Sequence, residues 1–388
     1  MRLIHTSDWH LGRILYKKSL LEDQRFFIYD FFLPALDELS PDAVMISGDI
    51  FDRQIAPTEA IALFDGFISE LCIKRGIKLF IITGNHDGAD RFALAPELLS
   101  KSGLYISSRL DVNSPPVRLE CGNERADIYM LPYFDPARAR AALETAGYDA
   151  EKITTFSDAY SAVLDIKCRD MDKSAVNILM AHCFASGAAK SESESVMYLG
   201  NAGEVSPSLF DRFDYAALGH LHGPQRSGEK GRYSGSPLKY SFDEENQRKA
   251  IFVLDIKNNK IDVSEYRVKP LHDMRTVTGG IEEIESAAKL DASPEDYIYA
   301  KIEGAPVYEP MLRLRKVYPN ILDLKNGNLT AIGGNAERDE LREKLMHSNS
   351  SGLSLMTEFF RQMCGYEPDE QDVSLLKELL SSADEDKA

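Results

Sequence analysis

The stretch VMISGDIFD, residues 44–52, places an apolar run directly before two aspartates. The run is short and contains β-branched side chains, which is typical of a buried strand. Four further runs share this character and also end in polar clusters. This matters because ligands of open α/β sheets bind beyond the carboxyl ends of the strands. The five clusters are DWH at 8–10, GDIFD at 48–52, GNHD at 84–87, AHC at 181–183 and GHLH at 219–222.

Strand-like and helix-like segments alternate along the first two thirds of the chain, which predicts a layered α/β domain over residues 1–268. A smaller α+β domain is expected over 269–334, followed by C-terminal helices over 335–388. In the first domain the predicted helices are 19–39, 57–74, 136–146 and 155–170, and the predicted hairpin joins 250–255 to 260–266. The later segments are helix 281–290, strand 297–302, helix 308–316, strand 320–324 and helices 337–347, 354–364 and 368–381.

Composition narrows the class of protein. The 388 residues are 44% hydrophobic and carry a formal charge of −17. Such a charge argues against a stand-alone protein that grips nucleic acid tightly, because neutralising phosphates requires Lys and Arg. It is compatible with a DNA-processing enzyme in which divalent ions add positive charge at the site. No apolar run approaches the length of a membrane span. Five scattered cysteines and the absence of a secretory segment predict a cytoplasmic protein with reduced thiols.

The clusters contain the ligand types of a two-metal hydrolase. Such a site needs a carboxylate that bridges two ions, further oxygen and nitrogen ligands, and a water activated by the ions. Asp49 follows a strand end and is the expected bridge. Asp8 and His10 are two residues apart and point the same way if the segment is extended, and Asn85 offers an amide oxygen. Each residue alone is weak evidence, since a strand-end aspartate is as often a turn or a helix cap. The prediction rests on the joint pattern.

The order D-x-H, GD, GNHD, H, GHxH resembles the calcineurin-like metallophosphoesterase superfamily. Within it, TSDWHLG at 6–12, GDIFD at 48–52, ALGHLH at 217–222, YSGSPL at 233–238 and SFDE at 241–244 resemble the SbcD family of nuclease subunits. The tail beyond residue 244 is similar only in its layout. The resemblance implies a four-layer α-β-β-α sandwich, a homodimer and two Mn²⁺ ions, with Mg²⁺ as a possible substitute. It also implies exonuclease and endonuclease activity on DNA ends and hairpins in repair, recombination and replication, coupled to an SMC-like ATPase of the SbcC type.

The resemblance also implies roles for individual residues. One metal takes Asp8, His10, Asp49 and His222, and the other takes Asp49, Asn85, His182 and His220. His86 is the residue that assists the transition state and faces away from the ligands. Archaeal relatives carry a second catalytic histidine where this chain has Asp52. Asp52 is therefore either an orienting carboxylate or only a helix cap.

Two basic groups are candidates for DNA contact. Arg13, Lys17 and Lys18 follow the first ligand pair, where they either hold flanking phosphates or form a solvated loop. Arg313, Arg315 and Lys316 are the densest basic group of the second domain and are either DNA contacts or the solvated side of a packed element. Trp9 is expected in the wall of the site rather than stacked on a base.

The C-terminal region and the lack of an ATPase motif point to a partner. Residues 356–363 carry a Met/Phe patch at helical spacing, with leucines at 375, 376, 379 and 380, and this surface fits either the chain's own helices or an ATPase partner. No G-x-x-x-x-G-K-[ST] motif occurs, so ATP dependence requires another subunit. Two rival functions remain at this stage: a phosphoesterase acting on phosphoproteins or small diesters, and a non-catalytic scaffold for a partner ATPase.

Overall fold

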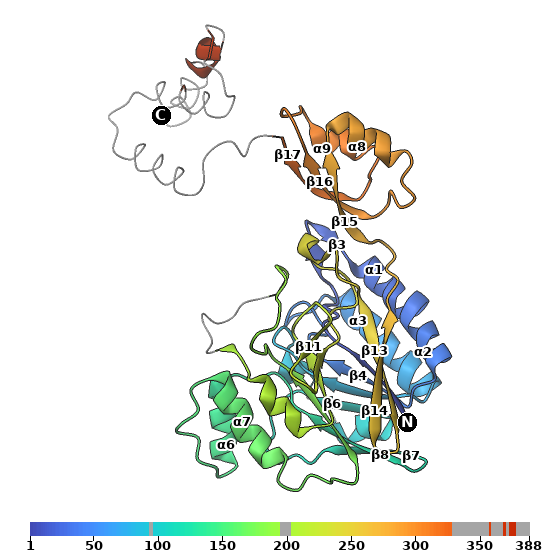
Figure 1. Cartoon of the computed structure of the whole chain (residues 1–388), viewed down its shortest axis with the longest axis vertical. Coiled ribbons are helices and arrows are strands. Elements are labelled where there is room, and N and C mark those ends of the chain that lie inside the picture. The colour runs from blue at the N-terminus through green and yellow to red at the C-terminus, as the bar shows by residue number, and fades with distance from the viewer. Residues whose placement is uncertain (93–95, 195–202, 328–356, 358–367, 370–371, 378–388) are drawn as a thin grey trace, which may run out of the picture. The chain divides into compact units, whose positions relative to one another are not determined.

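The computed structural model describes residues 1–92, 96–194, 203–327, 357, 368–369 and 372–377. The chain divides into two compact units, Met1–Arg275 and a second that begins at Thr276 (Figure 1). Among the described residues, no helix combines the length and the apolar character that a membrane crossing requires.

The first unit contains two six-stranded sheets. In the first sheet, β1, β4, β5 and β6 are parallel, and the antiparallel hairpin β13–β14 lies beside β1. Its strands, in order across the sheet, are β14 (Lys260–Arg267), β13 (Ala250–Lys257), β1 (Arg2–Thr6), β4 (Ala43–Ser47), β5 (Lys78–Ile82) and β6 (Leu104–Ser107). The strands β1, β4 and β5 are apolar runs that the sequence predicted, whereas β6 was not predicted, and the predicted hairpin is confirmed.

The second sheet supplies the other two ligand-bearing strands. Its central strands β8, β9, β10 and β12 are parallel, while the edge strands β7 and β11 are antiparallel. In order, they are β11 (Gln225–Ser227), β12 (Gly231–Tyr233), β10 (Tyr215–Gly219), β9 (Val176–His182), β8 (Glu124–Met130) and β7 (Val117–Cys121). All residues of β9 and β10 are buried, as expected for strands covered on both faces.

Alternation along the strands explains the layers. Leu3 and Ile178 belong to a core shared by the two sheets, so these sheets pack face to face. Leu179, the next residue on β9, instead packs with Tyr160 on the outer side of the second sheet. Ile4 is fully buried as well, so the first sheet is also covered on both faces. The result is the expected four-layer α-β-β-α sandwich.

Helices form the two outer layers, and those of the N-terminal part lie on the opposite side of the unit from α6 and α7 (Figure 1). The predicted helix 19–39 is observed as α1 (Leu21–Phe26), a π-helical segment (Phe27–Phe32) and α2 (Leu33–Leu39). Its aromatic side chains Phe27 and Phe32 are buried and stack on each other, so they fill the core rather than an outer surface. The remaining predicted helices are observed as α3 (Thr58–Ile68) with a π-helical end (Ser69–Lys74), α6 (Pro136–Thr145) and α7 (Phe156–Lys167).

The second unit is an α+β domain. Its sheet has the order β15 (Met274–Gly279), β16 (Tyr297–Ile302) and β17 (Ile321–Asn326), and α8 (Ile281–Ala288) and α9 (Pro310–Leu314) share its core. The sequence analysis predicted no strand over the residues of β15. Helix α9 is shorter than the predicted 308–316, because Glu309 takes a left-handed conformation and Pro310 then begins the helix.

Most of the predicted C-terminal helices lie outside the described residues. This applies to 337–347, to 354–364 apart from helical Thr357, and to Leu379 and Leu380. Residues 372–377 are helical, and within them Leu376 is buried while Leu375 is exposed.

Candidate metal centre

The loops that follow the strands of both sheets meet at one place. The amide of Asp8 donates to the carbonyl of Gly48, and that of His10 to the carbonyl of Asp49, each at 3.0 Å. From the second sheet, the amide of His220 donates to the carboxylate of Asp8 at 2.9 Å. Strand ends that are far apart in the sequence are therefore joined by hydrogen bonds, as the pattern of clusters predicted.

Backbone strain is concentrated at these loops. Asp8, His10, Asp49 and His220 have φ angles of 55°, 44°, 50° and 105°. Side-chain-bearing residues adopt this region rarely, and such strain gathers at functional sites. Gly84 allows a further close approach, because a Cβ there would lie 2.1 Å from Oδ1 of Asp49. The backbone is thus shaped around the Asp49 carboxylate.

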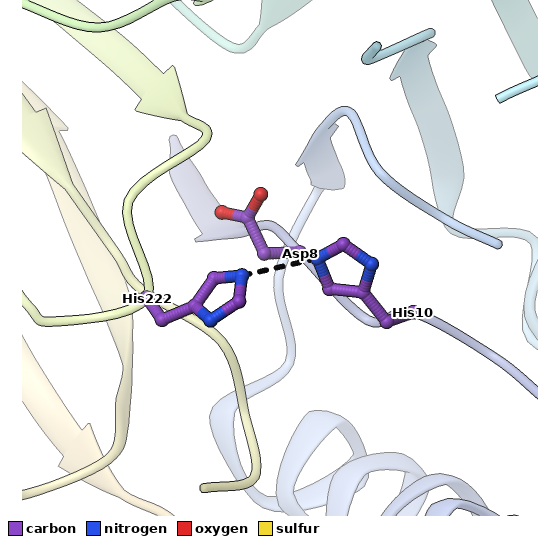
Figure 2. Close-up of side chains that lie close together, drawn as sticks. All are labelled: Asp8, His10 and His222. Atoms are coloured by element: carbon purple, nitrogen blue, oxygen red, sulfur yellow. Dashed lines mark hydrogen bonds between the residues drawn. The ribbon is translucent and has the colours of Figure 1, made fainter. Parts of the chain in front are cut away.

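Three groups of buried or half-buried side chains could each hold a metal ion. In each group the potential ligand atoms lie within 4.8 Å of one another. Two groups share Asp49 and two share His10, so the three form one continuous cluster. Figure 2 shows the first, in which the rings of His10 and His222 approach each other beside the Asp8 carboxylate. The groups are Asp8–His10–His222, His10–Asp49–His86 and Asp49–His182–His220.

The donor atoms face one another at short range. Nε2 of His10 lies 3.1 Å from Nε2 of His222. The amide oxygen of Asn85 lies 3.0 Å from Nε2 of His182 and 3.0 Å from Nδ1 of His220. Lone pairs that face each other across such distances repel unless a proton or a cation lies between them. Carboxylate, amide oxygen and imidazole together suit a divalent ion of borderline softness, so the residues fit a metal.

Burial sets the ionisation of the metal-free centre. It raises the pKa of the Asp8 carboxyl to about 8 and lowers the pKa of His220 to about 3. Burial also opposes a proton on His182, but the adjacent Asp49 carboxylate outweighs it and raises the pKa of His182 to about 9. The same pairing holds the pKa of Asp49 well below its usual value, although burial acts in the other direction. Without metal, the centre therefore retains protons where a cation would otherwise balance its charge.

The sequence as a whole matches known proteins along nearly its full length. A family model for calcineurin-like phosphoesterases matches residues 1–224, and one for a type 5 capsule protein repressor C-terminal domain matches 270–363. Proteins from Staphylococcus saprophyticus and Staphylococcus epidermidis, both named as the D component of nuclease SbcCD, are 36% and 34% identical over 330 residues. These alignments cover 84% of the chain and 85% of each relative. The chain belongs to the SbcD family of calcineurin-like phosphoesterases.

Membership of the SbcD family fits the geometry of the centre. The phosphoesterase match ends at residue 224 and so includes every residue of the three ligand groups. The chain is a metal-dependent phosphodiesterase of the nuclease type, and this cluster contains the candidate ligands for a divalent metal.

His86 is closer to the ligands than the sequence suggested. It had been expected to face away from them, yet one of its ring nitrogens shares a group with His10 and Asp49. Its amide donates to the Asp49 carboxylate at 2.9 Å, and Nδ1 donates to the carbonyl of Asp52 at 2.8 Å. Because a carbonyl only accepts, the proton of a neutral His86 ring is on Nδ1.

Asp52 and Arg13 form a pair behind His10. Oδ1 of Asp52 lies 3.2 Å from Nη1 of Arg13 and 3.8 Å from Nδ1 of His10. The guanidinium of Arg13 also lies over the ring of Tyr240, 4.8 Å from its centroid. The Asp52 carboxylate therefore faces a potential ligand, but it makes no hydrogen bond with Nδ1 of His10, which has no hydrogen-bond partner among the described residues. Arg13 is engaged by protein groups rather than solvated.

The other basic candidates fall in two places. Lys17 and Lys18 are exposed in the hairpin of β2 (Ile14–Leu15) and β3 (Lys18–Ser19), which follows the first ligand pair. Arg313, Arg315 and Lys316 belong to the second unit, not to the cluster. The guanidinium of Arg313 is held by both oxygens of Glu285, at 2.9 and 2.7 Å.

Sequence reasoning missed the residues that support the ligands. The carboxylate of Asp87 accepts the amides of Phe51 and Gly84, at 3.0 and 2.9 Å, and so ties the GDIFD and GNHD loops together. Burial raises the pKa of Asp87 to about 6. Its place as the last residue of GNHD was the available signal. Ser7 donates to Asp8 at 2.6 Å, and its position directly before a ligand was the corresponding signal there.

Trp9 lies in the wall of the site, as predicted. It is 1% exposed, and its ring makes edge contacts with Phe27, Phe32 and Phe67 of the helical layer. Its indole N–H donates to Thr6 at 3.0 Å. The residue between two potential ligands is thus fixed by packing and is not exposed for stacking on a base.

Proposed function

We propose that this chain is a Mn²⁺-dependent DNA nuclease that hydrolyses phosphodiesters with two ions, with Mg²⁺ as a possible substitute. The observation that carries the proposal is the position of Asp49, which is shared by two groups of potential ligands on either side of it. A carboxylate in this position is what a two-ion site requires. The chain's membership of a family that includes named nuclease subunits supports DNA as the substrate.

The proposed ligand sets are those that the family resemblance implies, and the observed groups bring most of their members together, although Asn85 is in none of the groups and His86 is in one. Asp49 is the bridge, one ion takes Asp8, His10 and His222, and the other takes Asn85, His182 and His220. Bound ions would supply Lewis acidity and a water of lowered pKa at neutral pH. The chain's own contribution is to hold buried donors at fixed positions, so that little reorganisation is needed when charge develops on the phosphate.

His86 is assigned to the leaving oxygen. With Nδ1 donating to the carbonyl of Asp52, the ring is oriented so that Nε2 is the nitrogen that exchanges a proton with the substrate. The Asp52 carboxylate is held by Arg13 and faces His10, where a proton on Nδ1 of His10 would pair with it once the ring binds an ion through Nε2. Its catalytic contribution is therefore positioning, exerted on a ligand through its carboxylate and on His86 through its carbonyl.

A cleft beside Asn85 supports a polymeric substrate. It has a volume of about 680 Å³ and is lined by Arg91, Arg109 and Arg138 together with Asp87, Asp90 and Asp135, and Arg109 is paired with Asp90. Nucleic-acid backbones are held mainly by donors such as arginine. Of the basic residues predicted from the sequence, Lys17 and Lys18 are exposed and are the stronger candidates for phosphate contact. Arg313 is occupied by Glu285, and Arg315 and Lys316 remain candidates in the second unit.

The chain is expected to work with partners. The relatives are named as one component of nuclease SbcCD, and this chain has no P-loop, so we infer an SbcC-type, SMC-like ATPase as its partner in DNA repair, recombination and replication. A net charge of −17 supports the same conclusion, because a basic partner would add the phosphate contacts that this chain lacks. The C-terminal region 335–388 is assigned to this partner and 269–334 to a DNA-facing cap. A cytoplasmic location follows from a DNA substrate in a bacterial-type complex.

A homodimer is also inferred. The side chain of Ile61, which is 43% exposed, lines an apolar cavity of about 310 Å³ together with Phe64 and Phe92. Exposed apolar groups beside an apolar hollow are typical of protein interfaces. Light scattering on the purified chain measures the state directly, and a monomer at micromolar concentration would rule the dimer out.

Cleavage assays on the isolated chain test the function. We expect duplex ends and hairpins to be cut with Mn²⁺ and not after chelation. If a chromogenic phosphomonoester is turned over orders of magnitude faster than DNA, the phosphatase alternative is correct. If the chain binds no metal and cleaves neither substrate but stimulates a partner ATPase, the scaffold alternative is correct.

A further inference from the structure

The SFDE motif, residues 241–244, has no role in the two ligand sets. Its last residue, Glu244, is fully buried, and Lys249 is also buried, at 7% exposure. Nζ of Lys249 lies 2.6 Å from Oε2 of Glu244. Burying an ion pair generally stabilises a protein less than apolar side chains of the same volume would. Packing alone therefore does not explain why these two charged side chains are buried. The explanation must lie in the residues that they contact.

The pair touches His222 through both its ring and its backbone. Nδ1 of His222 donates to Oγ of Ser193 at 2.5 Å, and the Ser193 hydroxyl in turn donates to Oε1 of Glu244. Oε1 also lies 3.4 Å from Nδ1 directly. On the other side, Lys249 donates to the carbonyl of His222 at 2.8 Å. The amide of His222 donates to Glu194 at 2.6 Å, so the residue is held at its ring, its N–H and its C=O.

This arrangement fixes the tautomer of the ring. A carboxylate cannot donate, so the chain from Nδ1 through Ser193 to Glu244 requires the proton on Nδ1. Nε2 is then the lone-pair nitrogen, and it is the one that faces His10, at 3.1 Å (Figure 2). A histidine that donates one ring N–H to a carboxylate and presents the other nitrogen is the usual arrangement at metal sites.

We propose that Glu244, with Lys249 as its counter-ion, is the positioning carboxylate for one of the two ions, the one held by Asp8, His10 and His222. This rests on the proposed function. No ligand of the second ion is hydrogen-bonded to the Glu244 carboxylate in the described part of the chain, since the partners of that carboxylate there are Ser193, His222, Tyr240, Ser241 and Lys249. Loss of Glu244 is therefore selective: one ion is weakened and the other is kept.

Mn²⁺ titration of the full chain, followed by calorimetry and by electron paramagnetic resonance, tests the proposal. We expect the unmodified chain to bind two ions and E244Q to bind one as before, with the other weakened roughly 10–100-fold. The resonance signal of a coupled ion pair should give way to that of an isolated ion at intermediate metal concentration. E245Q, which makes the same chemical change on the half-buried neighbour, should bind both ions normally.

E244Q leaves the Lys249 ammonium buried without its partner and is at risk of unfolding. If circular dichroism finds it unfolded, the double variant E244Q/K249M removes both charges and decides the matter by the same titration. Two ions bound with unchanged affinity in a folded variant would overturn the positioning role. Equal weakening of both ions would do so as well. If the unmodified chain binds no Mn²⁺, the proposed function fails instead.

Discussion

Raising the pH from about 7 to about 8.5 should destabilise the metal-free chain. In the folded protein the pKa of Asp8 is about 8 and that of His182 about 9, whereas the ordinary values are 3.8 and 6.5. Both folded-state values are raised, so across this interval the native state holds protons that the unfolded chain has already released. Stability falls with pH wherever the native state binds more protons, and it is lost as the pH rises through the folded-state values.

The size of the loss follows from the two titrations. Integrated over this interval, the loss from Asp8 is on the order of 1 kcal/mol and that from His182 on the order of 2 kcal/mol. Two other shifted groups act in opposite directions: Glu194, with a pKa raised to about 7, adds a smaller loss, and Lys167, with a pKa lowered to about 8, gives a gain that exceeds the loss from Glu194 but is smaller than the loss from Asp8 and His182 together. The sum for Asp8 and His182 is about 3 kcal/mol, which corresponds to roughly 5 °C in Tm for a unit of this size.

Differential scanning calorimetry of the chelator-treated chain at constant ionic strength measures this loss. D8N removes one of the two titrating groups and should retain only the part from His182. Saturating Mn²⁺ should abolish the fall, because metal ligands must be deprotonated to bind and higher pH favours that. A Tm that stays level or rises with pH in the metal-free protein would refute the account of protons standing in for cations.

Three further predictions concern residues of the site and the loop that follows its first ligand pair. A fourth concerns Trp9 in the wall of the site. D49A should lose both ions and the nuclease activity together, as measured by metal titration and DNA cleavage. H86A should keep both ions while kcat falls roughly 10²–10⁴-fold. The double variant K17A/K18A should weaken DNA binding regardless of sequence and reduce the slope of log affinity against log salt by about 1 for each phosphate that is no longer neutralised. W9A should lower the free energy of unfolding by about 3–5 kcal/mol in urea titrations, because a large buried ring leaves a cavity.

Each of these predictions has a result that would contradict it. An H86A variant that binds fewer ions would make His86 a ligand, a possibility sharpened by its position beside His10 and Asp49. A D49A variant that retains one ion at full affinity would remove the bridging role. An unchanged salt slope in K17A/K18A would assign those side chains to solvent. A destabilisation well under 1 kcal/mol in W9A would mean that the helical layer repacks around the gap.

The potential ligands were predictable because strand ends are predictable. A short apolar run with β-branched residues identifies a buried strand without reference to its neighbours, and parallel strands bring their carboxyl ends to one edge. Asp49 and His182 were found in this way although they lie on different sheets. The strand β15 was missed for the opposite reason, since it carries threonine and arginine and is only partly buried. A pattern rule has little to detect in such a segment.

The residues that support the ligands could not be predicted with the same rules. Glu244 is polar within a polar loop, so nothing in the sequence distinguishes it from exposed Asp243 beside it. Its burial depends on where Lys249 and Ser193 lie, and those contacts span 5 and 51 residues. Arg313 illustrates the converse: its basic neighbours suggested DNA contact, and only the packing of α8 against it brought Glu285 within reach. Partner choice among charged side chains is decided by tertiary structure.

Each proposed ion takes ligands from both sheets. Asp8 and His10 follow β1 of the first sheet and meet His222, which follows β10 of the second, while Asn85 follows β5 and meets His182 of β9. In the metal-free chain the sheets meet at this edge through buried polar contacts such as the hydrogen bond between the His10 and His222 rings, whereas the apolar core between the sheets lies behind them. Binding should therefore close the edge and stabilise the sandwich by RT ln(1 + [Mn²⁺]/Kd), about 4 kcal/mol per site at a thousandfold excess over Kd.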